Sequence, residues 1–222
     1  MRLNPLLCMA FALVCNAALA QKPLTFSDSL FFYRVVLDTN TLVSDYQECT
    51  AKSITVLRVK DQKPVQIIKL DDDAFPCYWT EDEYFIVEDV NFDGRNDIRL
   101  LKSMGARGNT SYLFWLYDTA AKHFARDTAL EMLPNPYVDR NEKKITSYWS
   151  LGCCEYGTEV YDYKNGKLEL YEEESMHLDI VEDNYVLTMK RRDANGEMQT
   201  LEEKRMTRQE VEGEEEEDDE QE

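Results

Sequence analysis

The sequence YFIVEDVNFDGRNDIRLL, residues 84–101, places two runs rich in Val, Ile, Leu and Phe on either side of an acidic turn containing Asp93-Gly94. Aromatic and β-branched residues favour strands, and Asp-Gly favours the positive φ angles of a tight reversal. This stretch therefore predicts a β-hairpin. Similar strand-like runs, separated by turn dipeptides such as Asn-Gly, recur along the rest of the chain.

These runs are short, and no long segment with helical periodicity separates them. They predict an all-β fold, either an antiparallel β-sandwich or a propeller-like barrel. The unbroken apolar run 112–117 predicts a central strand that is covered on both faces. The ten expected strands are 31–37, 53–59, 65–70, 84–87, 98–101, 112–117, 144–149, 159–163, 168–171 and 184–189.

The two ends of the chain differ in composition from the part between them. Residues 1–20 combine an early Arg, an apolar run and Ala18-Leu19-Ala20, which predicts a signal peptide cleaved before Gln21 and a periplasmic protein. A lipid anchor at Cys15 is the alternative. We expect a single all-β domain over 21–205 and a disordered acidic tail over 206–222, which lacks apolar surface to bury.

The charge balance restricts the class of partner. The chain has 44 acidic and 25 basic residues, a net charge of −19, and ten of the acidic residues lie in 210–222. Binding to nucleic acid or to an anionic membrane surface depends on Lys and Arg, so neither partner is expected. No transmembrane segment is expected either, and a basic protein is the natural partner.

The turn between the expected strands 84–87 and 98–101 has the spacing D-x-N-x-D-G-x-x-D, over residues 89–97. Calcium prefers six to eight oxygen ligands, and this spacing supplies them from one short loop. The strand-like flanks and Leu100 at the twelfth position distinguish it from an EF-hand, so we expect a calcium-binding hairpin loop that stabilises the fold. The alternative is a plain acidic turn. The expected ligands are the side chains of Asp89, Asn91, Asp93 and Asp97 and the backbone carbonyl of Arg95.

Four cysteines remain after the predicted cleavage. An even number in an exported protein suggests disulfides, and we expect a bond between Cys49 and Cys77. Cys153 and Cys154 are adjacent, so they form either a vicinal bridge or free thiols. No nucleophile, zinc-protease or phosphate-loop motif is present, so we do not expect an enzyme, although a carboxylate pair of the glycosidase type stays open.

Between residues 84 and 168 the chain resembles a family of bacterial periplasmic β-proteins. Its members include immunity proteins against secreted lysozyme-like effectors, and they are similar to periplasmic inhibitors of invertebrate-type lysozyme. The resemblance is carried, in order along the chain, by 88–94 with Asp97-Ile98, Tyr112, 115–117, 133–136, Asp139, 144–147, Tyr161 and 165–168.

The resemblance implies a function and a site. The calcium ligands would be Asp89, Asn91, Asp93 and Asp97, and the chain would bind and inhibit a basic lysozyme-like cell-wall hydrolase. In that family a loop enters the glycan cleft of the lysozyme, and the candidate here is 105–112. The alternative is a calcium-stabilised envelope or cell-surface module that binds glycan or protein without inhibition. The expected partner-binding residues of the loop are Arg107, Asn109 and Tyr112.

Overall fold

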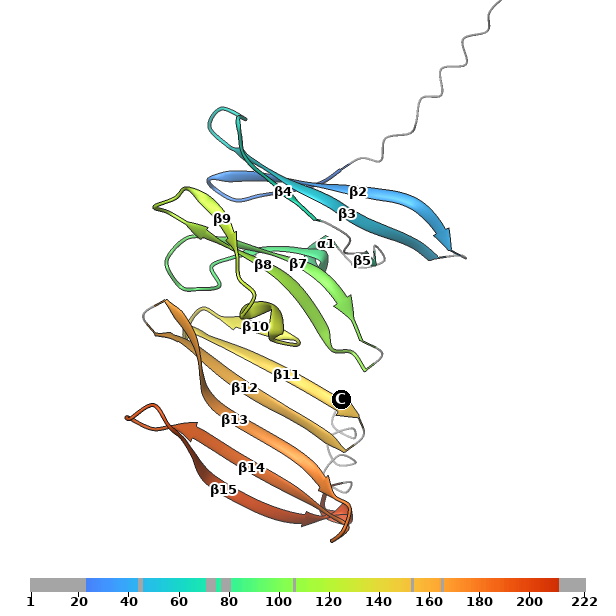
Figure 1. The fold of residues 1–222 in the computed structure, drawn as a ribbon, viewed down its shortest axis with the longest axis vertical. Coiled ribbons are helices and arrows are strands. Elements are labelled where there is room, and N and C mark those ends of the chain that lie inside the picture. The colour runs from blue at the N-terminus through green and yellow to red at the C-terminus, as the bar shows by residue number, and fades with distance from the viewer. Residues whose placement is uncertain are drawn as a thin grey trace, which may run out of the picture.

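A computed structural model of the chain describes residues 23–43, 46–70, 75–76, 81–105, 107–152, 154–164 and 166–211. Three antiparallel sheets follow one another in chain order along the longest axis of the molecule (Figure 1). The all-β prediction is confirmed. None of the three sheets closes into a barrel, and there are three of them in series where a sandwich has two.

The sheets are meanders in which nearly every strand pairs with its neighbour in sequence. The first contains β1 (Leu24–Ser27), β2 (Phe31–Val43), β3 (Tyr46–Arg58), β4 (Pro64–Lys69) and β5 (Phe75–Pro76), which pairs with β3. The second follows the short helix α1 (Glu81–Tyr84) and contains β6 (Phe85–Glu88), β7 (Asp97–Met104), β8 (Thr110–Asp118) and β9 (His123–Arg126). The third follows the 3-10 helix η1 (Leu130–Met132) and contains β10 (Pro136–Asp139), β11 (Lys144–Gly152), β12 (Glu155–Lys164), β13 (Lys167–Asp179), β14 (Asn184–Arg192) and β15 (Met198–Thr207).

Each of the ten predicted strands overlaps an observed strand, and five further strands were not predicted: β1, β5, β9, β10 and β15. Two of these have a clear physical reason. β10 begins at Pro136, which an edge strand tolerates at its first residue. β15 is an edge strand whose side chains are mostly exposed, so it lacks the apolar alternation of a covered strand.

The predicted boundary at residue 205 falls too early. β15 continues to Thr207, a helical turn follows to residue 211, and Met206 and Val211 are buried. These two side chains pack with Met176 and Tyr185 in a small apolar cluster on the third sheet. The predicted signal peptide and residues 212–222 lie outside the described residues.

The main core joins the facing sides of the sheets. Between the first two sheets it is aromatic: the ring of Tyr33 lies 5.6 Å from Phe85 and 6.0 Å from Phe124, measured between centroids. Gln66 ties the same interface together, because its amide donates to the carbonyl of Phe124 (2.9 Å) and accepts from the Phe124 N–H (2.7 Å). Residues 112–115 of β8 are buried, which agrees with the prediction of a covered central strand.

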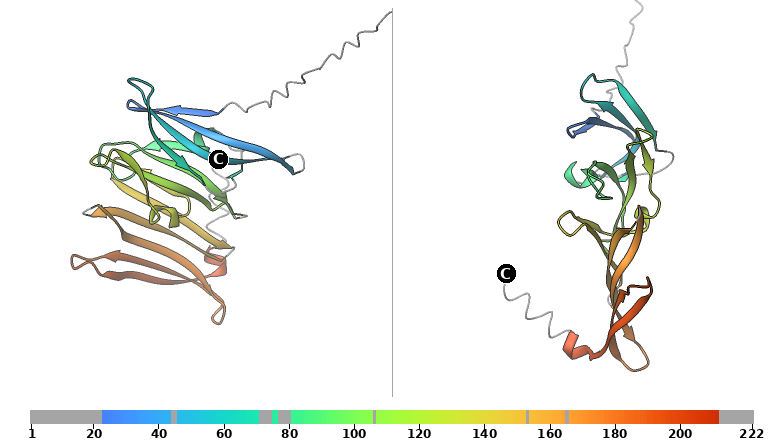
Figure 2. Two further views of the ribbon diagram at one scale, coloured as in Figure 1. Left: turned by 45° about the horizontal axis from the view of Figure 1, so that its top comes forward. Right: turned by 90° about the vertical axis from the view of Figure 1, so that its left-hand side faces the viewer.

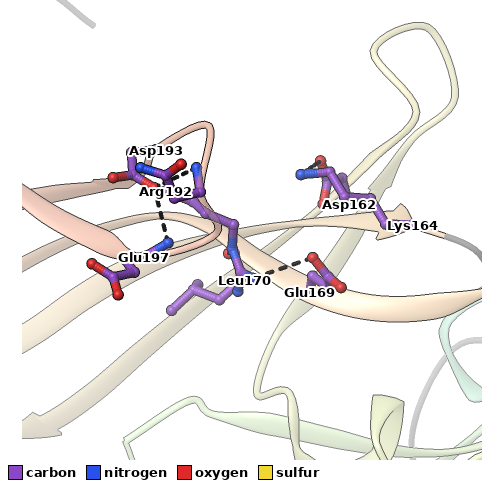
Figure 3. Close-up of polar contacts among 8 residues, drawn as sticks. Asp162, Lys164, Glu169, Leu170, Arg192, Asp193 and Glu197 are labelled. Carbon is purple, nitrogen blue, oxygen red and sulfur yellow. Dashed lines mark hydrogen bonds and ion pairs between the residues drawn. The ribbon is translucent and has the colours of Figure 1, made fainter.

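Tyr161 and Tyr163 of β12 and Leu168 of β13 pack against this core, and the rest of β12 to β15 extends beyond it as a single layer (Figure 2). Opposite charges face each other across β13 and β14, with Glu172 and Arg191 2.6 Å apart. At the end of the same pair, Arg192 donates to the Leu170 carbonyl (2.6 Å) and lies 3.2 Å from Glu169 (Figure 3). Cross-strand pairs of this kind contribute roughly 0.2–1 kcal/mol each, so charge pairing supplements the small apolar cluster here.

In the described part of the chain, no helix is long and apolar enough to cross a membrane.

Candidate functional site

The predicted calcium loop connects β6 to β7. The side-chain oxygens of this loop accept hydrogen bonds from the backbone of the same loop. The carboxylate of Asp89 accepts from the N–H of Asp93 (3.0 Å) and of Gly94 (2.8 Å). Asn91 Oδ1 accepts from the N–H of Asp93 (3.1 Å), and Asp93 Oδ1 accepts from the N–H of Arg95 (2.8 Å). The chain therefore wraps around its own carboxylates, with Gly94 at φ +85° providing the reversal.

Asp97, the last predicted ligand, is fully buried at the start of β7. Its two oxygens accept from the backbone N–H of Val90 (2.9 Å) and of Tyr117 (2.8 Å). Burial raises the pKa of Asp97 to about 7, and the charge of Asp93 acts in the same direction, while the backbone donors oppose the shift. A buried carboxylate of this kind is stabilised either by a proton or by a cation.

The donor chemistry of the loop fits calcium, because carboxylate, amide and backbone oxygens are the ligands that a hard cation prefers. A carboxylate oxygen that accepts one N–H also keeps a further lone pair for a cation. Among the described residues, however, no three His, Cys, Asp or Glu side chains are gathered closely enough to hold a metal ion. The predicted ligands thus share one loop without forming a preassembled cluster, and calcium binding stays a prediction.

The predicted partner loop connects β7 to β8 and is well held. Within it, the N–H of Gly105 donates to the Asn109 carbonyl (2.8 Å) and the N–H of Gly108 donates to the Gly105 carbonyl (3.0 Å). Asn109 then bonds to β11 at both ends of its amide, donating to the Ser150 carbonyl (2.8 Å) and accepting from the Ser150 N–H (3.2 Å). The role of Asn109 in this structure is therefore to position the loop against the third sheet.

Asn135, which the sequence interpretation did not assign to the site, reinforces this junction. Its side chain accepts from the Thr110 N–H (2.7 Å) and donates to the Tyr148 carbonyl (2.9 Å). Its backbone has φ +44°, a left-handed conformation that Asn tolerates better than most residues. The signal in the sequence was the single Asn between two prolines at 134 and 136, which marks a fixed turn.

Arg107 and Tyr112 lie in opposite environments. Arg107 is exposed next to Gly152, close enough that a Cβ on Gly152 would come within 3.0 Å of its Nη1, and it has no ion-pair partner in the described part of the chain. Tyr112 is only 8% exposed, with the guanidinium carbon of Arg99 4.8 Å from its ring centroid. Its burial does not agree with the predicted contact to a partner, because the strand β8 turns this side chain into the core.

The two candidate loops lie at opposite ends of β7 (Figure 1). An eight-residue strand separates them by roughly 25 Å. The calcium loop therefore does not support the 105–109 turn directly. The direct support of that turn comes from β11 through Asn109 and Asn135.

The predicted disulfide cannot be located, because the side chains of Cys49 and Cys77 lie outside the described residues. Cys154, at the start of the segment that enters β12, is disulfide-bonded.

Comparison with known proteins identifies a structural relative. No family model matches the sequence, and no curated protein matches it. Among solved structures, the chain is similar to a Xanthomonas protein described as related to a type IV secretion system, with a TM-score of 0.61 and 22% sequence identity. The similarity covers 84% of this chain and 97% of the Xanthomonas protein. The two therefore share the fold over nearly the whole length of the Xanthomonas protein.

Proposed function

We propose that this protein is a periplasmic calcium-binding inhibitor that binds a lysozyme-like cell-wall hydrolase and protects the cell against it. The observation that carries the proposal is the 105–109 turn, a tight loop held against a second sheet, in which Arg107 is exposed and has no ion-pair partner among the described residues. The fold it shares with a protein related to a secretion system is consistent with a role against secreted effectors.

The geometry suits a loop that enters a glycan cleft. A loop fixed in one conformation loses little conformational entropy on binding, which improves affinity without added contact area. Glycosidases bring two carboxyl groups together in their clefts, and a guanidinium pairs with a carboxylate through two parallel hydrogen bonds. Because this protein is acidic overall, a basic hydrolase would also be attracted to it over a longer range.

Replacing Arg107 by Ala is expected to weaken inhibition by about 10- to 100-fold, since a central Arg in an interface contributes on the order of 1.4–3 kcal/mol. The measurement is a turbidity assay of cell-wall lysis with a panel of lysozyme classes, titrated with the mature protein. Arg34→Ala is the matched control, because Arg34 is also exposed but lies on β2 in the first sheet.

Inhibition by the wild-type protein should weaken with salt, because surface charges are screened beyond about 8–10 Å.

The alternative is a calcium-stabilised envelope or cell-surface module without inhibitory activity. If no hydrolase is inhibited, the inhibitor proposal is wrong. If the wild-type protein inhibits and Arg107→Ala inhibits as well as Arg34→Ala, the assignment of Arg107 to the interface is wrong. A pull-down from envelope extract that recovers glycan or structural envelope proteins and no hydrolase would favour the alternative.

The calcium part of the proposal has its own test. Calcium at a hundredfold excess over its Kd should add about 2.7 kcal/mol to the free energy of unfolding, because it binds only the folded loop. Thermal unfolding with EDTA and with calcium measures this, and Asp93→Ala should abolish the difference. Asp118→Ala is the control: Asp118 also accepts two backbone N–H bonds in a turn, from Ala120 and Ala121, but lies outside the loop. Equal melting temperatures for the wild-type protein in EDTA and calcium would refute the assignment.

A further inference from the structure

A cavity of about 450 Å³ lies where the first and second sheets meet, at the end of their strands that carries the predicted calcium loop. The turns that surround it, β1–β2, β3–β4, β6–β7 and β8–β9, gather at the same end of these two sheets (Figure 1). Its volume falls within the range of about 300–1,000 Å³ that is usual for small-molecule sites. The inhibitor proposal does not use it, since the 105–109 turn is at the other end of β7.

The walls of this cavity combine cations with an apolar floor. Every charged side chain that lines it is basic, namely Arg58, Arg95 and Lys122, although acidic residues outnumber basic residues 44 to 25 in the chain. The apolar part includes Phe31 and Tyr117, whose ring centroids are 5.2 Å apart. A site of this composition is suited to a ligand with an anionic end and a flat apolar body.

Two of the three cations are available to a ligand. The third, Arg58, forms an ion pair with Asp61, whose Oδ1 lies 3.0 Å from the guanidinium Nε. Arg95 and Lys122 are exposed, and neither has an ion-pair or hydrogen-bond partner for its side chain within the described ranges. Lys122 has φ +55°, so the turn holds its backbone in a left-handed conformation at the edge of the cavity. Cations that no carboxylate compensates, in an acidic protein, mark a local site for an anion.

We infer that this cavity binds a small organic anion, with a carboxylate or phosphate group held between Arg95 and Lys122 and an apolar body on Phe31 and Tyr117. Arg58 completes the basic wall. The inference does not depend on hydrolase inhibition, because the cavity and the 105–109 turn lie at opposite ends of β7. It also does not require calcium, since it rests on the side chain of Arg95, whereas calcium would use its backbone carbonyl.

The test uses three ligands with the same ring system: 1-naphthoate, 1-naphthyl phosphate and the neutral 1-naphthalenemethanol. Binding to the mature protein is measured by calorimetry and by chemical-shift changes of the backbone amides, in EDTA so that bound calcium does not contribute. At least one of the two anions should bind at least tenfold more tightly than the alcohol, with shifts centred on residues 30–31, 58, 95 and 117–122. The tighter anion shows whether the cavity prefers a carboxylate or a phosphate group.

The Arg95→Gln, Lys122→Gln double variant should weaken binding of the anions by tenfold or more and leave the alcohol nearly unchanged. The matched control is Arg34→Gln, Lys143→Gln, which removes the same two charges from exposed positions outside the cavity; Lys143 also has a left-handed backbone, at φ +52°. This control should change anion binding less than twofold. Equal affinity for anions and alcohol, an equal loss in both double variants, or shifts centred elsewhere would overturn the inference.

Discussion

Replacing Glu88 by Ala is expected to lower the free energy of unfolding by roughly 3–5 kcal/mol, because it leaves a buried guanidinium without its carboxylate. Glu88 Oε1 lies 2.9 Å from Arg99 Nε, with only 11% and 10% of the two side chains exposed. Arg99 also donates to the Pro136 carbonyl (2.7 Å), so the pair connects the second sheet to β10 of the third. Burial lowers the pKa of Arg99, and the charge of Glu88 opposes that shift.

Urea denaturation followed by circular dichroism measures the change. Glu172→Ala is the control, because its partner Arg191 is about half exposed and such pairs contribute about 0–1 kcal/mol. Adding Arg99→Met to Glu88→Ala should recover much of the loss, since an apolar side chain of similar length needs no counter-charge. A loss below about 1 kcal/mol for Glu88→Ala would show that the pair does not hold the two sheets together.

The second large effect concerns pH. Because the pKa of Asp97 is raised to about 7 in the folded chain and is about 3.9 when unfolded, the folded state binds more protons between these values. The contribution of Asp97 is therefore fully present below about pH 4 and is lost as the pH rises through 7. At about 1.4 kcal/mol for each pH unit, the loss amounts to roughly 4 kcal/mol at most.

The measurement is thermal unfolding between pH 4 and 8 in EDTA, so that a bound cation does not compensate the carboxylate. Other groups titrate in this range, so the informative quantity is the difference between the wild-type protein and Asp97→Asn, whose profile should be flatter because the amide stays neutral at every pH. Asp118→Asn should keep the wild-type profile, because backbone donors lower the pKa of Asp118 out of this range. Parallel profiles for the wild-type protein and Asp97→Asn would contradict the prediction.

The strands were predictable where one or both faces are covered, because burial imposes an apolar pattern that can be recognised in a short stretch of sequence. Strand β15 could not be predicted, since its side chains are mostly exposed. The alternation Ile98-Arg99-Leu100 similarly suggests a solvent-facing Arg99, yet residues of the third sheet cover it. Burial created by a distant segment leaves no mark on the nearby sequence.

The candidate site was likewise predictable only where its residues are consecutive in the sequence. The wrapped shape of the predicted calcium loop could be expected from the sequence, because the predicted ligands, the glycine and the turn are consecutive, and the structure places them in one loop. The partner loop depends on contacts between residues 41 apart in sequence, as with Asn109 and Ser150, and the local sequence does not encode them. The burial of Tyr112 could not be predicted either, since the direction of its side chain depends on where β8 lies among the three sheets.

The order of the strands also has a kinetic consequence. Apart from the pairing of β3 with β5, every described strand finds its hydrogen-bonding partners in the strands that precede or follow it directly. Loop-closure entropy is smallest for such near-neighbour pairing, so this topology should fold quickly for an all-β protein. A chain that emerges N-terminus first, from a ribosome or a translocation channel, completes the ladder of one sheet before the next appears. Vectorial folding of this kind shortens the time during which unpaired edges are open to aggregation.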